Sequence, residues 1–163
     1  MIMKPISATK KGVIISVALI ASSLITFYPL QMSERGQSQY ITLSIFIAGL
    51  VWVLYSFKQK NPSSSFKAYF NEGFKCFIVV TLLMVLHTFV FYKLNPQILE
   101  NAIQENNAII QNGGNRTAME IAENTKKIRN IFMPMMLSIN TIKYLILGSL
   151  ISVVCGGFFS QKN

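Results

Sequence analysis

The chain has 163 residues, of which 52% are hydrophobic and 13% are charged, and its formal net charge is +9. Ordinary soluble domains carry about 25% charged residues, so this composition excludes that class and indicates an integral membrane protein. The basic excess does not indicate nucleic-acid binding, because no basic surface interleaved with aromatic residues remains outside the apolar segments.

Four segments are apolar over the length of about 20 residues that a helix needs to cross a bilayer. They cover residues 12–30, 40–57, 74–92 and 135–159. Backbone groups in lipid must form hydrogen bonds within their own segment, so each is predicted to be a helix. The first segment is longer than the apolar region of about 7–15 residues in a signal peptide and no A-x-A-like site follows it, which predicts a permanent anchor. The predicted fold is an all-α membrane protein with four spans in a single domain, residues 1–163.

The charges of the loops predict which side of the membrane each end of the chain occupies. The leader, the loop between the second and third spans, and the tail are rich in lysine, whereas charges nearly balance in the other two loops. Because Lys and Arg favour cytoplasmic loops, both termini are predicted to be cytoplasmic, in the inner membrane of a bacterium. The residues concerned are Lys4, Lys10, Lys11, Lys58, Lys60, Lys67, Lys75 and Lys162 on the inner side, and Glu34 and Arg35 in the first outer loop.

Residues 95–133 are predicted to form an amphipathic helical hairpin on the outer side of the membrane. Proline suits the first position of a helix and asparagine caps free amides, so Asn95 and Pro96 are expected to begin its first helix. Apolar residues then recur at helical spacing and predict one apolar stripe, formed by Ile98, Leu99, Ala102, Ile103, Ile109 and Ile110.

The hairpin has a turn signal at its centre. Gly113 and Gly114 are predicted to end the first helix, since adjacent glycines suit backbone positions with positive φ. "TAME", from Thr117 to Glu120, matches a capping box, in which a hydroxyl and a carboxylate satisfy the free amides at the start of a second helix.

The inner loop before the third span contains "SSSFKAYFNEGFK", which predicts an interfacial helix. Aromatic residues share one face, and lysines can reach lipid headgroups, so the segment is expected to anchor the chain to the bilayer or to dock a protein. The residues of this face and its charges are Phe66, Tyr69, Phe70, Phe74, Lys67 and Lys75.

The chain offers few residues for catalysis. It has no aspartate, one histidine, and two cysteines without C-x-x-C spacing, Cys76 and Cys155, which are expected to be small buried hydrophobic residues. Glutamates of the hairpin could form a carboxylate pair, but glutamates on polar helix faces are ordinarily solvated. These glutamates are Glu100 with Glu105 and Glu120 with Glu123. We therefore expect no enzyme activity, no cofactor and no metal site.

Besides Lys75 at the start of the third span, a histidine and a lysine lie further inside predicted spans, where ionisable groups are costly and often functional. His87 is expected to be neutral and hydrogen-bonded to a neighbouring helix, or alternatively to form a proton or ligand site. Lys143 is expected to extend its ammonium to the membrane interface, or alternatively to be a buried cation that shares a polar cavity with His87.

The fourth span has a pattern that favours close helix packing. Gly148, Ser152 and Gly156 recur every four residues and therefore line one face, where a neighbouring backbone can approach. Shorter versions of the pattern are Gly12 with Ser16 in the first span and Ser44 with Ala48 in the second. The pattern indicates helix packing in a bundle more than a ligand site.

The order of several motifs resembles a bacterial family of integral membrane proteins known as domain of unknown function 4199. The motifs are "GVIIS", "FKAYFNEGFK", "NPQILE", "IFMPMM" and "GSLISVVCGGFF", and the resemblance covers nearly the whole chain. It implies a four-span inner-membrane protein without an established catalytic residue. Relatives can be encoded near enzymes that use lipid-linked sugars, which implies such enzymes as one kind of partner.

Three functional hypotheses follow. The first is a non-catalytic scaffold or accessory subunit of a membrane complex, which docks a membrane-protein partner through the hairpin and the interfacial segment. The second is a small transporter or channel, expected to act as a homo-oligomer, although the sequence lacks the broken helices and internal repeats typical of transporters. The third is an enzyme, or an enzyme's partner, in lipid-linked sugar metabolism.

Overall fold

The computed structural model describes residues 6–30, 37–114 and 117–160. Within these ranges the chain contains α-helices and no strand. The helices are α1 (Ala8–Phe27), α2 (Gln37–Lys60), α3 (Phe66–Leu94), α4 (Gln97–Asn112) and α5 (Ala118–Ser160). Lys4, Glu34, Arg35 and Lys162, which support the predicted orientation, lie outside the described residues.

Four of these helices, α1, α2, α3 and α5, are long and apolar enough to cross a membrane. This result confirms the predicted all-α class with four candidate spans. Two helices are longer than the predicted spans. α3 begins at Phe66, so the interfacial segment and the third span are one helix. α5 has 43 residues and continues through Pro134, so the second half of the expected hairpin and the fourth span are also one helix.

The fold divides into two compact units, and each is described by itself. The first, here called the bundle, comprises Met1–Met84 and Thr141–Asn163. The second, here called the hairpin unit, comprises Val85–Asn140. The expectation of a single domain over residues 1–163 stays a prediction.

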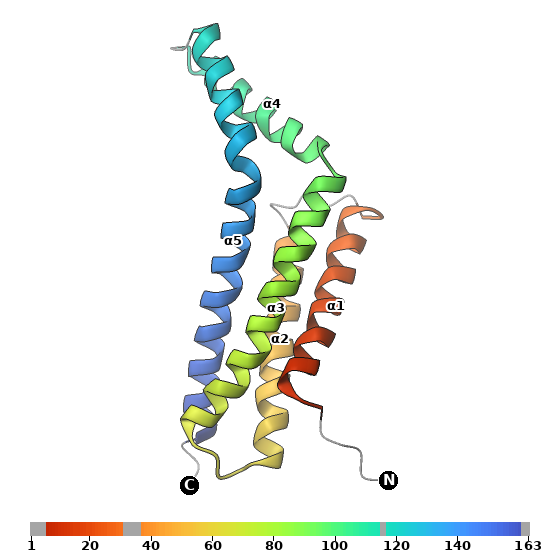
Figure 1. Cartoon of the computed structure of the whole chain (residues 1–163), viewed down its shortest axis with the longest axis vertical. Helices are drawn as coiled ribbons and strands as arrows, with labels where there is room; N and C mark the ends of the chain where they lie inside the picture. The colour runs from red at the N-terminus through yellow and green to blue at the C-terminus, as the bar shows by residue number, and fades with distance from the viewer. Residues whose placement is uncertain (1–5, 31–36, 115–116, 161–163) are drawn as a thin grey trace. The chain divides into compact units, whose positions relative to one another are not determined.

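The bundle packs α1, α2, the first part of α3 and the last part of α5 around one apolar core. Leu19, Phe46 and Phe77 are fully buried there, and the Phe46 ring meets the Tyr144 ring edge-on with centroids 5.1 Å apart. α1 begins and α5 ends at the same end of the bundle, here called the terminal end (Figure 1).

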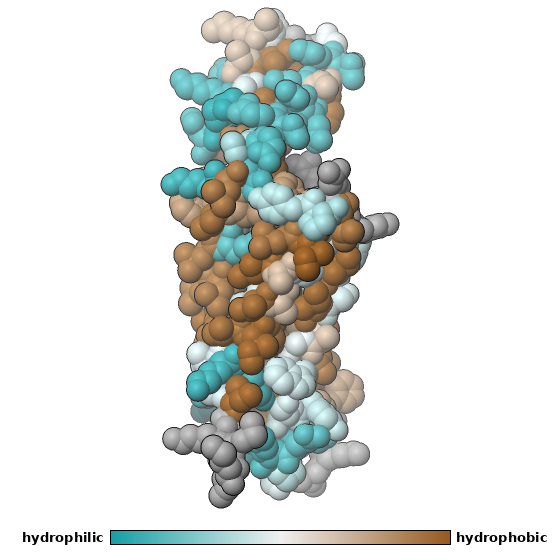
Figure 2. All heavy atoms as spheres, turned by 90° about the vertical axis from the view of Figure 1, so that its right-hand side faces the viewer, coloured by the Kyte–Doolittle hydropathy of each residue, from teal (hydrophilic) through white to brown (hydrophobic). Residues whose placement is uncertain are grey.

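Large hydrophobic side chains also cover the outside of the bundle. Val17, Leu82 and Leu150 are among those that are exposed. Figure 2 faces α1 and shows a band of hydrophobic side chains there, with hydrophilic side chains gathered at the terminal end. Large exposed apolar surfaces are unusual for a soluble protein but are expected where lipid is the solvent.

Glycine residues allow the helices of the bundle to approach one another closely. A Cβ atom placed on Gly148 would lie 2.5 Å from the Phe77 ring of α3, and one on Gly12 of α1 would lie 2.8 Å from the Cys76 carbonyl oxygen of α3. A Cβ atom on Gly156 would lie 3.3 Å from the Phe66 ring. The face of α5 formed by Gly148, Ser152 and Gly156 is therefore buried against α3.

The small residues of the second span, Ser44 and Ala48, are not buried in this way. Ser44 and Ala48 are exposed, so the expectation that they pack against a neighbouring helix is wrong. α2 approaches α1 at Gly49 instead, where a Cβ atom would lie 2.9 Å from the side chain of Ile15. A single glycine is sufficient here because the Ile15 side chain fills the space that the glycine leaves open.

We predict that Gly148→Ala lowers the free energy of unfolding by about 1–3 kcal/mol, the usual cost of overpacking. The added methyl group would overlap Phe77, which is itself buried and has little room to move. Gly157→Ala is the matched control, because a Cβ atom there has nothing within 4 Å. Denaturant titration in detergent micelles measures both variants, and equal stability would contradict the prediction.

Candidate functional site

Side-chain hydrogen bonds join α4 to the first part of α5. Asn124 donates to Asn106 over 2.7 Å, and Asn107 donates to the Thr125 hydroxyl over 3.0 Å. Farther from the turn Glu100 pairs with Arg129, so from Glu100 to Asn106 along α4 the partners on α5 fall from Arg129 to Asn124, and the two helices run antiparallel. We call α4 together with residues 118–133 of α5 the hairpin.

An ion pair extends this contact away from the turn. The Arg129 guanidinium donates to both carboxylate oxygens of Glu100, over 2.6 and 3.0 Å, and both side chains are about half exposed. Exposed ion pairs contribute only about 0–1 kcal/mol, but a two-bond pair has a fixed geometry and so specifies the register. A second exposed pair, Lys127 with Glu123, lies along α5 itself.

The expected turn signals have separate roles. Gly114 has a φ of +72°, whereas Gly113 has a right-handed helical backbone with φ of −74°. Thr117 and Glu120 form the predicted capping box. The Thr117 amide donates to the Glu120 carboxylate over 2.7 Å, and the Glu120 amide donates to the Thr117 hydroxyl over 3.3 Å. This prediction is confirmed.

The start of α4 differs from the expectation. The N-cap residue is Pro96, which has no side-chain hydrogen bond, and the helix begins at Gln97. Asn95 donates its side-chain amide to the Phe91 carbonyl at the end of α3, over 2.8 Å, and its side-chain oxygen accepts from Gln97 over 3.1 Å. Asn95 therefore ties the last turn of α3 to the first turn of α4.

The predicted apolar stripe of α4 is only partly buried. Ile103 is buried, but Ile109 is 71% exposed. Near the turn, α4 contacts α5 through Asn106 and Asn107, which displaces Ile109 from the contact. On the other side of the turn Met119 is 82% exposed, which is the largest exposure of any large hydrophobic side chain in the described part of the chain. We call Ile109 and Met119 the apolar tip of the hairpin.

His87 lies on α3 within the hairpin unit. Its ring stacks on the Phe91 ring with centroids 5.6 Å apart, and its Nε2 atom is buried without a hydrogen-bond partner among the described residues. The adjacent Thr88 accepts a hydrogen bond from the Asn140 side chain of α5 over 3.1 Å. The expected bond to a neighbouring helix is therefore made by Thr88 rather than by His87. The sequence patterns considered above did not include Asn140, although an amide within an apolar segment is a signal for such a bond.

Lys143 lies on α5 within the bundle and is half-buried. Its ammonium lies 4.9 Å from the centroid of the Tyr144 ring, a cation–π contact. The alternative of a polar cavity shared with His87 would combine one residue from each unit, and it stays a prediction.

The aromatic residues at the start of α3 do not all share one free surface. Phe66, Phe70 and Phe74 stack in sequence with centroids 6.3 Å apart at each step, and Lys67 and Lys75 are exposed. Tyr69 is the exception, because it is 0% exposed. Its ring packs against Phe57 at 5.3 Å and Phe159 at 5.8 Å. The expectation that Tyr69 belongs to the interfacial face is wrong, since its angular position on the helix faces α2 and α5.

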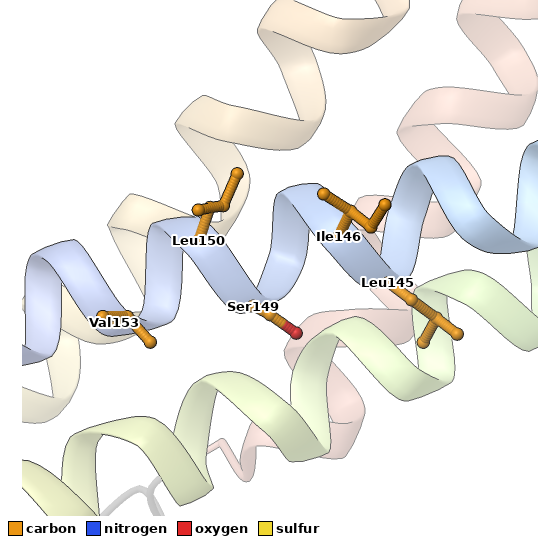
Figure 3. Close-up of a pocket in the computed structure, with 5 residues that line it drawn as sticks. All are labelled: Leu145, Ile146, Ser149, Leu150 and Val153. Carbon is orange, nitrogen blue, oxygen red and sulfur yellow. The ribbon is translucent and has the colours of Figure 1, made fainter.

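α5 also carries a shallow apolar groove of about 420 Å³ (Figure 3). Leu145, Ile146, Ser149, Leu150 and Val153 line it. Ser149 is the only polar residue of this lining, so the groove offers a ligand a single hydroxyl. Among the described residues no three side chains of His, Cys, Asp or Glu lie close enough to hold a metal ion.

The described helices define an all-α membrane protein with four helices of spanning length. Within this class, the chain belongs to the family described as "Protein of unknown function (DUF4199)", which it matches over residues 10–161. The resemblance inferred from the sequence motifs is therefore confirmed. No curated protein and no solved structure matches the chain.

We predict that Asn107→Ala weakens the hairpin by about 0.5–1.5 kcal/mol, the net contribution of a hydrogen bond. The loss follows because Asn107 exchanges hydrogen bonds with Thr125 in both directions. Hydrogen exchange followed by mass spectrometry should show faster exchange in residues 97–127. Asn101→Ala is the control, because Asn101 is an exposed asparagine of the same helix. Equal exchange in the two variants would contradict the prediction.

We predict that His87→Phe raises the free energy of unfolding by about 1 kcal/mol, because a buried unpaired polar atom costs about 1–3 kcal/mol. Phenylalanine can keep the stacking on Phe91 and removes Nε2. Leu86→Phe, at an exposed apolar position of α3, is the control and should change stability little. Thermal unfolding in detergent measures both, and a loss of stability in His87→Phe would show that the imidazole has a partner.

Proposed function

We propose that this protein is a non-catalytic docking subunit of a membrane complex in the bacterial inner membrane. The apolar tip of the hairpin is its main binding surface for a partner protein. The single observation that carries this proposal is the position of Ile109 and Met119, which are 71% and 82% exposed at the turn of a hairpin held by polar contacts.

The surroundings of the apolar tip distinguish it from the lipid-facing surface of the bundle. Exposed apolar residues of the spans lie in long apolar segments, whereas Ile109 and Met119 have polar exposed neighbours such as Gln111, Asn112 and Glu120. Such residues interrupt a hydrocarbon-facing surface. An apolar contact residue surrounded by a polar rim is the usual composition of a protein-binding site.

The polar contacts behind the tip support the same role. Binding loses less entropy when the binding surface is ordered beforehand. The bonds of Asn106 and Asn107 lie within one turn of Ile109, and the capping box of Thr117 and Glu120 flanks Met119. The tip is therefore held in place from both sides.

The proposed orientation follows the lysine distribution, with both termini in the cytoplasm and the hairpin outside it. Lys10, Lys58, Lys60 and Lys67 all lie near the terminal end of the bundle, as cytoplasmic lysines would. In this orientation Phe66, Phe70 and Phe74 lie at the cytoplasmic interface, where they provide an anchor or a second docking surface.

A small transporter or channel is the second candidate, and one observation favours it. A buried imidazole nitrogen without a partner, His87 Nε2, is the kind of group that binds a proton or a ligand within a membrane.

We predict that Ile109→Glu and Met119→Glu each reduce partner capture about tenfold, because an alanine-sized truncation of a central apolar contact typically costs 1 kcal/mol or more and a charge costs further. A membrane-impermeant amine crosslinker is added to intact spheroplasts, and the partner is quantified by mass spectrometry. Lys126 lies in the hairpin and is exposed for this reaction.

Gln111→Glu is the matched control, since it adds the same charge at an exposed polar position of the hairpin. Unfolding curves of the purified variants establish that the bundle is intact. Equal partner capture in all three variants would overturn the docking proposal. Capture of only a second copy of the chain would favour the transporter, and absence of hairpin crosslinks would overturn the orientation.

A further inference from the structure

Lys11 is a buried cation at the terminal end of the bundle. It lies in the second turn of α1, and only 5% of its surface is exposed. Its ammonium lies 5.3 Å from the centroid of the Trp52 ring of α2. The neighbouring Gly12 allows α1 to approach the Cys76 carbonyl of α3 closely.

The charges around Lys11 leave it without a direct counterion. Two charged side chains act on Lys11 electrostatically. One is the cation Lys60 of α2 and the other is the anion Glu72 of α3. No carboxylate among the described residues lies within ion-pair distance of the Lys11 ammonium. Its interaction with Trp52 is the direct contact that the described residues provide.

The Lys11 ammonium is not completely enclosed. Among the described residues it has no hydrogen-bond acceptor, yet its Nζ atom is not one of the fully buried polar atoms without a partner. The atom therefore keeps a small area in contact with its surroundings.

This arrangement favours a negative charge near Lys11. A buried cation is costly unless an anion pairs with it. The position of Lys11 near the N-terminus of α1 adds to this cost, because the N-terminal end of a helix carries a partial positive charge. Two ammonium groups, of Lys11 and Lys60, and one carboxylate, of Glu72, leave one net positive charge. One phosphodiester group would neutralise it.

We propose that Lys11, Lys60 and Trp52 form a binding site for the phosphate group of an anionic phospholipid, with Glu72 as the charge that limits its affinity. The site lies where α1 begins and α2 ends, and both are helices of spanning length, so lipid headgroups meet the protein at this level. Tryptophan also favours the headgroup region. Free inorganic phosphate has the same charge chemistry, so the experiment must separate the two sources. The site is independent of docking at the apolar tip.

The test uses the full chain purified in nonionic detergent and exposed to phosphatidylglycerol or phosphatidylcholine, with retained lipid counted by native mass spectrometry. Lys11→Gln should retain about fivefold less phosphatidylglycerol, the effect of one lysine near a headgroup, and unchanged phosphatidylcholine. Lys10→Gln is the matched control, because it removes the same charge from the adjacent, exposed residue. An equal loss in Lys10→Gln would overturn the site.

A second variant keeps the proposal testable if Lys11→Gln does not fold. Glu72→Gln removes the opposing carboxylate and should increase phosphatidylglycerol retention about twofold or more, since each nearby charge contributes on this scale. Unchanged or lower retention would overturn the proposal. An excess of inorganic phosphate should leave the bound phosphatidylglycerol in place, and its displacement would assign the site to free phosphate instead.

Discussion

The close approach of helix backbones is the constraint on which the bundle depends. In lipid, apolar side chains gain little by moving from solvent to protein, so helices associate chiefly through dispersion contacts that need short distances. Gly12, Gly49 and Gly148 provide these distances by leaving space that Val79, Ile15 and Phe77 fill. The core is thus defined by positions that lack a side chain as much as by those that have a large one.

Small hydroxyl side chains also fit into these close helix contacts. Ser16 donates to the Gly12 carbonyl over 2.8 Å, and Ser152 donates to the Gly148 carbonyl over 2.7 Å, each one turn earlier in its own helix. These serines are small enough to sit in a tight contact and leave no polar group unsatisfied. Thr88 differs, because its hydroxyl accepts from Asn140 of another helix and so specifies which helix lies beside it.

The sequence was sufficient to predict the elements, because a span must be apolar and helical whatever surrounds it. It predicted the capping box for a similar reason, since Thr117 and Glu120 form hydrogen bonds with backbone amides that are close in sequence. It could not predict which apolar face meets protein and which meets lipid, because both environments accept the same residues. Ser44 was therefore misassigned and Gly49 was missed. Lys11 was counted as a loop charge because its burial depends on α2 and α3, which are distant in sequence.

Pro134 has a consequence for the mechanics of α5. Proline has no amide hydrogen, so the Asn130 carbonyl one turn earlier lacks its usual partner, and the proline ring crowds that carbonyl. The helix thus lacks one backbone hydrogen bond at this point, and proline is a usual site of bending in long helices. Any bend of α5 is therefore expected at Pro134, whereas Gly148 and Ser152 lie in buried, packed turns.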